Sequence, residues 1–236
     1  MQLNTKNILY LDNHLLVIDK PPGMLIQGDR TGDISLFEIA KKFIKEKYNK
    51  PGNVYLGLVH RLDRPASGVV CFARTSKAAA RLSEQFRKKS TVKIYRAIVE
   101  GLIPESGKFE DNILRRETTS FISQDGKGKP ADLTFRKIVA KNNRSLVEIK
   151  LGTGRHHQIR VQFASRGFPV IGDFRYGSKL KFPDRTIALH AYSLTIEHPT
   201  KKEIVTFSCN PGKNWPIEYQ RIHKKYGQYN SNSRYH

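Results

Sequence analysis

One segment of the chain, residues 60–68, places a carboxylate between two cations in a sequence that turns sharply. Asp63 lies between Arg61 and Arg64, and Pro65 follows. Guanidinium groups beside a carboxylate favour its ionised form, and an ionised carboxylate in a fixed position can act as a nucleophile. An ordinary turn aspartate with a surface ion pair would give the same local pattern. The segment alone leaves both interpretations open.

Apolar runs on both sides of this segment predict the strands that hold it. The run at residues 54–59 precedes it, and the run at residues 69–73 follows it. Strand-forming residues bounded by Pro65 and Gly68 indicate a strand, a short loop and a second strand. We therefore expect Asp63 on a loop between two strands, where rigid scaffolds commonly place reactive groups.

The charge of the chain points to a polyanionic partner. It has 42 Lys and Arg against 21 Asp and Glu, a formal net charge of +21, and the basic residues occur throughout. We find neither the roughly 18 uninterrupted apolar residues of a spanning helix nor the apolar core of a secretion signal. These features favour nucleic acid over a membrane as the partner.

The cysteines and histidines predict a reducing compartment and no metal. Cys71 and Cys209 are the two cysteines, which fits the cytoplasm, and they have no metal-site spacing. The adjacent pair His156 and His157 lacks flanking cysteine or acidic ligands. We expect a cytoplasmic protein without a metal site.

The remaining sequence predicts one continuous α+β domain in which strands dominate. Strands are expected in residues 7–19 around a turn at Asp12 and Asn13, and at 93–100, 146–151, 187–191 and 193–196; helices are expected at 34–47, 76–88 and 156–166. Residues 126–130 can supply phosphate contacts or form a solvated hairpin loop. The expected domain spans residues 1–226, followed by a disordered polar tail at 227–236.

Three segments carry a family resemblance: His60-Arg61-Leu62-Asp63-Arg64-Pro65-Ala66-Ser67-Gly68, Lys93-Ile94-Tyr95-Arg96-Ala97 and Thr153-Gly154-Arg155-His156-His157-Gln158-Ile159-Arg160. Residues 20–23, 126–131, 171–177 and 189–191 support them. In this order, over roughly residues 8 to 210, the set resembles the RluA-type pseudouridine synthases. The resemblance implies a single α+β catalytic domain with a mixed, mostly antiparallel bent sheet, flanking helices and a central cleft.

The resemblance also implies a reaction and its residues. Such enzymes isomerise uridine in RNA, here transfer RNA, large-subunit ribosomal RNA or both, without a cofactor or metal. By the family pattern Asp63 is the nucleophile, Arg160 pairs with it, and Tyr95 stacks on the flipped base. An arginine stays charged and can hold a carboxylate in a two-point fork. Whether Asp63 attacks the anomeric carbon, adds to carbon 6 or supports loss of the 2′ proton stays open.

Four basic residues are expected to contact the RNA. Arg61 would enter the gap that the flipped nucleotide leaves, whereas Arg155, Lys20 and Lys129 would contact phosphates, although the lysines fit solvated loops equally well. His60 is expected to be a structural hydrogen-bonding residue near the site. Because the first strand begins near residue 8, we expect the short class without an N-terminal RNA-binding domain, acting as a monomer without an obligate protein partner.

Two other functions fit part of the sequence. A noncatalytic RNA- or ribosome-binding protein could retain the fold and the charge. The presence of Asp63, Tyr95 and Arg160 argues against such an inactive site. A glycosidase-like hydrolase of nucleic acid would need a second placed acid. Asp173 is the acid to test, although its place after Gly172 favours a turn anchor.

Overall fold

The structure is a computed structural model that describes residues 5–216 and 219–220. Their strands form one 11-stranded sheet. The strands are β1 (Ile8–Leu11), β2 (Leu15–Lys20), β3 (Gly57–Leu58), β4 (Ser67–Ala73), β5 (Val92–Glu100), β6 (Ser106–Arg116), β7 (Thr119–Ser123), β8 (Lys129–Lys141), β9 (Arg144–Leu151), β10 (Leu189–Glu197) and β11 (Ile204–Ser208). The α-helices are α1 (Leu36–Lys47), α2 (Ser76–Arg87) and α3 (Gln158–Ala164), and the 3-10 helices are η1 (Thr5–Asn7), η2 (Phe174–Tyr176) and η3 (Pro183–Arg185).

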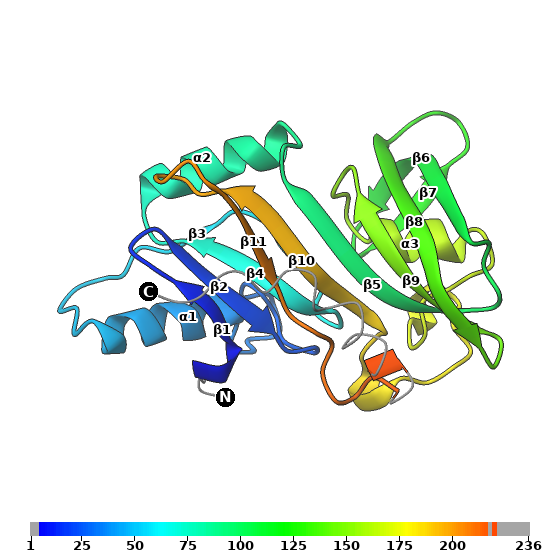
Figure 1. Cartoon of the computed structure of the whole chain (residues 1–236), viewed down its shortest axis with the longest axis horizontal. Coiled ribbons are helices and arrows are strands. Elements are labelled where there is room, and N and C mark those ends of the chain that lie inside the picture. The colour runs from blue at the N-terminus through cyan, green and yellow to red at the C-terminus, as the bar shows by residue number, and fades with distance from the viewer. Residues whose placement is uncertain (1–4, 217–218, 221–236) are drawn as a thin grey trace.

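The sheet has two halves that meet at β5. The strand order is β1-β2-β4-β10-β5-β9-β8-β6-β7, with β3 paired to β4 and β11 paired to β10. Figure 1 shows β1–β4, β10 and β11 on one side of β5, which we call the first half-sheet, and β6–β9 on the other side, the second half-sheet. The pairs are antiparallel except for β4 with β10. The predicted mixed, mostly antiparallel α+β fold is confirmed.

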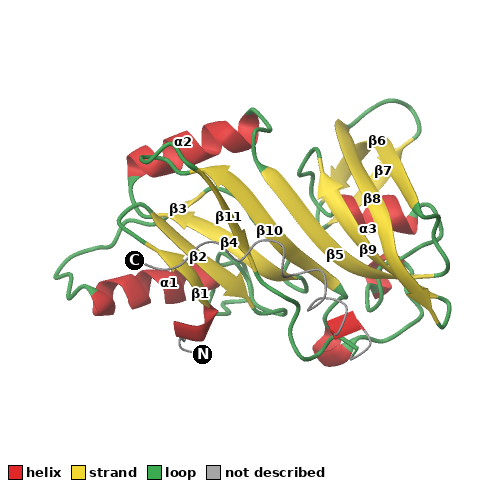
Figure 2. Ribbon diagram, in the orientation of Figure 1, coloured by secondary structure: helices red, strands yellow, loops and turns green. Residues whose placement is uncertain are grey.

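Helices cover both faces of the first half-sheet, because alternate side chains of its strands point to opposite sides. Leu16 and Ile18 of β2 pack with α1, whereas Leu15 and Val17 pack with α2. Figure 2 shows α2 above these strands and α1 below them. Helix α1 begins at a capping box in which the side chain of Ser35 accepts from the amide of Glu38 and that of Glu38 accepts from the amide of Ser35.

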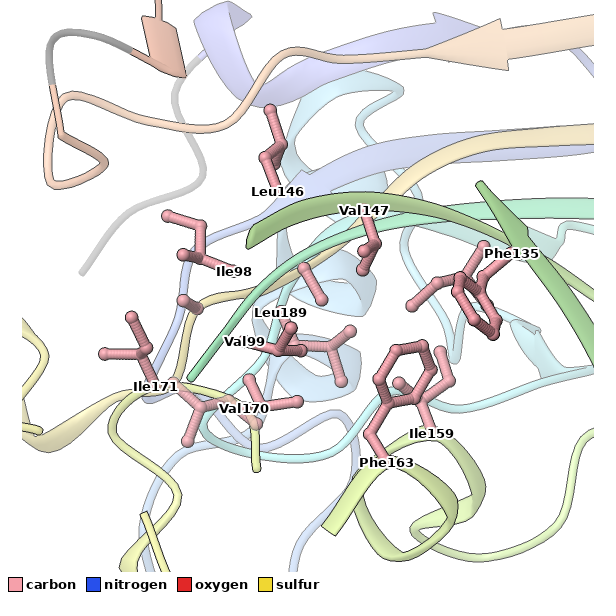
Figure 3. Packing of buried hydrophobic residues seen from close by; sticks show 14 of the residues in the cluster. Ile98, Val99, Phe135, Leu146, Val147, Ile159, Phe163, Val170, Ile171 and Leu189 are labelled. Atoms are coloured by element: carbon pink, nitrogen blue, oxygen red, sulfur yellow. The ribbon is translucent and has the colours of Figure 1, made fainter. Parts of the chain in front are cut away.

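The second half-sheet packs against α3. Figure 3 shows Ile159 and Phe163 of this helix facing Phe135 and Val147 of the sheet. The rings of Phe135 and Phe163 lie 5.5 Å apart at a T-shaped angle, and Phe163 is fully buried. Burying one such ring stabilises a fold by about 1.5–3 kcal/mol. This core therefore fixes the helix that carries Arg160.

Within the first half-sheet, β4 pairs with β10 in parallel over two residue pairs. His190 lies opposite Ser67, and Ala191 lies opposite Gly68. Gly68 has a φ of +115°, and a Cβ atom there would lie 2.3 Å from the Ala191 carbonyl oxygen. Only glycine fits this close approach. The strand that follows the Asp63 loop can therefore enter the sheet beside β10.

The structure differs from the sequence predictions at three elements. Helix α3 begins at Gln158 instead of residue 156, because His157 has a left-handed backbone (φ 54°), and it ends at Ala164 instead of residue 166. Within residues 54–59 only Gly57–Leu58 form a strand, since Val54 and Leu56 bury their side chains without pairing. Residues 189–197 form one strand with an irregularity before Ser193.

Two further predictions concern the ends and the location of the chain. The domain boundary at residue 226 and the polar tail at 227–236 lie outside the described residues. In the described ranges, every helix is too short or too polar to cross a lipid bilayer.

Candidate active site

Asp63 lies on the loop between β3 and β4, which main-chain hydrogen bonds hold in place. The Asp63 carbonyl accepts from the amide of Ala66 (3.1 Å), and the Pro65 carbonyl accepts from the amide of Ile187 (3.3 Å). The side chain of Asp63 is 25% exposed. The loop backbone thus holds Asp63 in place, and its carboxylate remains partly open to solvent.

The two arginines that flank Asp63 in the sequence do not enclose its carboxylate in the structure. Arg64 donates to the Gly23 carbonyl (3.1 Å) and forms an ion pair with Asp33 (2.6 Å). Arg61 is exposed at the rim of the site. Because the loop directs Arg64 away from Asp63, the expected pair of flanking guanidiniums around the carboxylate is wrong.

Arg160 on α3 is the guanidinium that reaches Asp63. Its Nη1 donates to Oδ2 of Asp63 (3.0 Å). Its Nε and Nη2 donate to Oδ2 and Oδ1 of Asp173, at 2.6 and 2.9 Å. The structure therefore places Asp63 and Arg160 together, but the two-point fork expected at Asp63 binds Asp173 instead.

The surroundings of Arg160 keep it charged and in position. Burial alone would lower the pKa of Arg160, but hydrogen bonds to Asp173 and the charges of Asp173 and Asp63 raise it above its ordinary value. The guanidinium also lies 5.1 Å from the ring centre of Tyr176, a cation–π contact. One fixed cation thus bridges two carboxylates.

The turn between β9 and α3 positions the helix relative to the sheet. The Thr153 hydroxyl donates to the Gln158 amide oxygen (2.7 Å), and the Arg155 backbone amide donates to the same oxygen (3.0 Å). Gln158 Nε2 donates to the Asp132 carbonyl of β8 (2.9 Å). Gln158 is buried, and these three hydrogen bonds tie the start of α3 to the second half-sheet.

Tyr95 lies in the centre of the sheet on β5. It faces Ala191 of β10 and Ile149 of β9 across the two neighbouring strands. Burial raises the pKa of the Tyr95 phenol, and the charge of Asp63 raises it further. The phenol therefore stays protonated at neutral pH, and its ring packs against the cores of both half-sheets.

An open pocket joins these side chains. Its lining consists of Arg61, Leu62, Asp63, Ala66, Tyr95, Leu151, Gly154, Arg155, His157, Gln158, Ile159, Arg160 and Leu189. A carboxylate, several arginines, an aromatic ring and apolar walls suit a flat, negatively charged ligand such as a nucleotide. In the part of the chain that the structure describes, no three metal-ligating side chains gather as a metal site.

The predicted phosphate contacts have different surroundings. Arg155 lines the pocket and donates from Nε to the Pro130 carbonyl (2.9 Å). Lys129 is exposed at the start of β8, beside the hairpin loop expected at residues 126–130. Both side chains are within reach of solvent and therefore of a polyanion.

Lys20 is wrong as a phosphate contact, because its side chain is fully buried. The ammonium donates to the carbonyls of Pro21 and Met24 at 2.9 Å each and of Arg64 at 3.2 Å. Burial lowers the pKa of Lys20 to about 7, although the charge of Asp63 opposes this shift. Lys20 thus braces the backbone beside the Asp63 loop.

His60 makes only structural contacts in the described residues. Its Nε2 accepts from the Cys71 amide (2.9 Å), and its ring stacks on Phe86 at 5.0 Å. Burial lowers the pKa of His60 to about 4. The imidazole is therefore neutral at physiological pH and serves the packing of β4 against α2.

Sequence reasoning missed the role of Asp173, which it treated as a turn anchor or a second acid. The Asp173 carbonyl does anchor the turn, since it accepts from Tyr176 and Ser178. Its carboxylate is buried and binds Arg160. A buried acid requires a partner, but no local pattern around Asp173 predicts its burial.

Comparison with known proteins shows the family of the chain. A family model described as RNA pseudouridylate synthase matches residues 14–165. An uncharacterised RNA pseudouridine synthase of Aquifex aeolicus is 33% identical over 228 residues, which cover 90% of this chain and 72% of the relative. The ribosomal large subunit pseudouridine synthase D of Zymomonas mobilis is 35% identical over 229 residues, covering 91% of this chain and 72% of the relative.

A solved structure shares the fold as well. The human RNA pseudouridylate synthase domain containing 1 superposes with a TM-score of 0.68 at 27% identity, covering 89% of this chain and 86% of that one. The solved structure agrees with the arrangement of the sheet, and the family match and the two relatives agree with each other in the family that they indicate. The chain therefore belongs to the RluA-type family of RNA pseudouridine synthases.

Proposed function

We propose that this chain converts uridines of RNA into pseudouridine with Asp63 as the nucleophile. The observation that carries the proposal is the 3.0 Å contact between Asp63 and Arg160 in a pocket that Tyr95 also lines. These three side chains come from a loop, a helix and a strand that are far apart in the sequence. Their convergence at one pocket is what the reaction requires.

The reaction is an isomerisation that needs no external reactant. The bond from N1 of uracil to the anomeric carbon breaks, the base rotates while bound, and carbon 5 joins the anomeric carbon. Carbon 5 then loses a proton, and N1 gains one. An ionised, positioned carboxylate serves each of the three possible first steps at Asp63.

Arg160 keeps Asp63 ionised within a partly dry pocket. A carboxylate that leaves water takes up a proton more readily, and a fixed cation opposes this. Because Asp173 holds the other two nitrogen donors of Arg160, the guanidinium cannot swing away when RNA enters. We assign Arg160 as the ion-pair partner that maintains the nucleophile.

Tyr95 forms the wall against which the uracil stacks. Aromatic side chains stack on everted bases in many RNA-binding proteins. The protonated phenol can also exchange a proton with the base after rotation. Stacking is the role that the central place of Tyr95 in the sheet supports more directly.

The basic residues at the rim hold the RNA. Arg61 fills the space that the flipped nucleotide leaves, while Arg155 and Lys129 contact phosphates. The net charge of +21 supports a strong electrostatic contribution to affinity. We propose ribosomal RNA of the large subunit as a substrate, by analogy with the named synthase D, transfer RNA as a second one, and monomeric action in the cytoplasm.

The rival functions have less support. A hydrolase with two catalytic carboxylates would need Asp173 free, but both of its oxygens accept from Arg160. A noncatalytic RNA-binding protein would not need a partly exposed carboxylate beside a buried guanidinium. It remains the alternative that the experiment must exclude.

The test maps pseudouridine in total RNA of cells that lack the gene and carry either the wild-type chain, Asp63→Asn or the exposed control Asp29→Asn. We expect the wild type and the control to restore the same pseudouridines and Asp63→Asn to restore none. Purified Asp63→Asn should still bind the target RNA. Retained turnover in Asp63→Asn would remove the nucleophile assignment, and no pseudouridine from the wild type would favour the noncatalytic alternative.

A further inference from the structure

His157 lies between Tyr176 and the proposed nucleophile, Asp63, and it has no role in the mechanism proposed above. Its Nε2 lies 3.6 Å from Oδ2 of Asp63, and its Nδ1 lies 2.8 Å from the Tyr176 hydroxyl. The His157 side chain is 7% exposed and lines the pocket. The 3.6 Å separation is longer than a hydrogen bond, but an N–H group at this distance still attracts the carboxylate electrostatically.

The backbone at His157 is unusual and fixes the direction of the ring. The residue has a φ of 54° and a ψ of 23°, a left-handed conformation that few residues other than glycine and asparagine adopt readily. The ring stacks on that of His156 at 3.8 Å and meets the Tyr176 ring edge-on. These contacts keep the imidazole in a single orientation.

The protonation state of His157 follows from its surroundings. Burial lowers the pKa of His157 to about 3, a shift that Asp63 opposes and Arg160 reinforces. The ring is therefore neutral at physiological pH and carries one N–H group. It cannot act as an imidazolium acid there.

The hydrogen-bond chain around Tyr176 decides which nitrogen carries that hydrogen. The Ser120 amide donates to the Tyr176 hydroxyl oxygen (2.9 Å). The hydroxyl is then free to donate its own hydrogen to Nδ1 of His157, which places the ring hydrogen on Nε2. A lone pair on Nε2 would instead face the negative charge of Asp63, so electrostatics favours the same tautomer.

The two contacts of the Asp63 carboxylate fall on one oxygen. Arg160 donates to Oδ2, and Nε2 of His157 also faces Oδ2. Among the described residues, no side chain or amide donates to Oδ1. This asymmetry separates the oxygen that is held from the oxygen that remains for the substrate.

We infer that His157, oriented by Tyr176, is a positioning residue that holds Oδ2 of Asp63 together with Arg160 and leaves Oδ1 to face the substrate. The inference rests on the proposed function of Asp63 as the nucleophile. It adds a residue pair to that site, and it names the carboxylate oxygen that is available to the reacting nucleotide.

The decisive variant is His157→Asn, because asparagine tolerates the left-handed backbone but does not reach both Tyr176 and Asp63. We expect its single-turnover rate to fall roughly tenfold to a hundredfold, because a reacting group displaced by about 1 Å can cost about a hundredfold in rate, with RNA affinity within about twofold of wild type. Tyr176→Phe keeps the ring and removes the hydroxyl, so it should lower the rate in the same direction.

The double variant and a histidine control outside the pocket separate positioning from a loss of packing. If both residues act through one hydrogen-bond chain, His157→Asn with Tyr176→Phe should be little slower than His157→Asn alone. The matched control His14→Asn removes an imidazole outside the pocket, whose ring meets that of His198 edge-on at 6.1 Å, and it should keep the rate within about threefold. Thermal melting of each variant shows whether it is folded at the assay temperature.

Two outcomes overturn the inference: a wild-type rate in His157→Asn, or an equal loss of rate in His14→Asn. A loss confined to RNA affinity would also overturn it, because a residue that positions the carboxylate affects the chemical step. These results differ from failure of the proposed function itself, in which the wild-type chain and every variant would form no pseudouridine.

Discussion

Replacing Asp173 with Asn should destabilise the fold far more than replacing Asp63 with Asn, although both carboxylates bind the same guanidinium. The Asp173 side chain is 2% exposed and takes two donors of Arg160. The Asp63 side chain is 25% exposed and takes one donor. Replacing Asp173 therefore leaves the buried guanidinium of Arg160 without its main partner, whereas replacing Asp63 does not.

The size of the effect follows from the burial of Arg160. Removing one partner of a buried ion pair costs about 3–5 kcal/mol, because the other charge stays buried and uncompensated. For a chain of 236 residues, that loss lowers Tm by roughly 6–20 °C, at about 2–4 °C per kcal/mol. In Asp63→Asn the guanidinium keeps its fork to Asp173, so we expect a loss of about 1 kcal/mol or less.

The assay is guanidinium chloride unfolding of both variants, combined with pseudouridine formation. Trp215, the one tryptophan of the chain, is buried in the same core as Ile159 and Phe163 of α3, so its fluorescence reports on the helix that carries Arg160. We expect Asp173→Asn to be unstable and slow, and Asp63→Asn to be stable and inactive. Equal stability of the two variants would refute the conclusion that Asp173 is the main partner of Arg160.

Three further predictions concern other parts of the molecule. Gly68→Ala should unfold more easily and lose activity, because its Cβ would collide with Ala191; a wild-type Tm would contradict the close approach. In salt titrations of RNA binding, Lys129→Ala should reduce the slope of log K against log salt by about 0.7–0.9, because it removes one exposed phosphate contact. Lys20→Met should leave this slope unchanged, because Lys20 is buried. A reduced slope in Lys20→Met would show that Lys20 contacts a phosphate after all. Burial lowers the pKa of His190 to about 4, whereas an unfolded histidine takes up its proton near pH 6.5. As the pH is lowered from about 6.5 to 4, the free energy of unfolding should therefore fall by up to about 3 kcal/mol. Urea unfolding of wild type and His190→Gln measures this, and parallel pH profiles would disprove it.

Several elements of the fold could be predicted from the sequence because their patterns are local. The alternation of Leu15 and Val17 with Leu16 and Ile18 is that of a strand covered on both faces, and β2 has this form. The spacing of Leu36, Ala40 and Ile44 predicts the buried face of α1, which the structure confirms. The loop position of Asp63 followed from Pro65 and Gly68.

The arrangement of the site depended on contacts that no local pattern contains. Asp63 and Arg160 were matched only through the family resemblance, since 97 positions separate them. The fork to Asp173 was missed because nothing near Asp173 indicates burial. Lys20 was placed at the surface because lysines are rarely buried, and three backbone carbonyls override that tendency here.

The parallel junction of β4 and β10 has a consequence for how the protein is made. Residues 67–68 pair with residues 190–191, which the ribosome adds more than a hundred positions later. Contacts so distant in sequence form late, because the intervening chain must first be ordered. An emerging polypeptide therefore cannot complete the pocket until most of the domain has been translated, since Leu189 of its lining belongs to the same late strand.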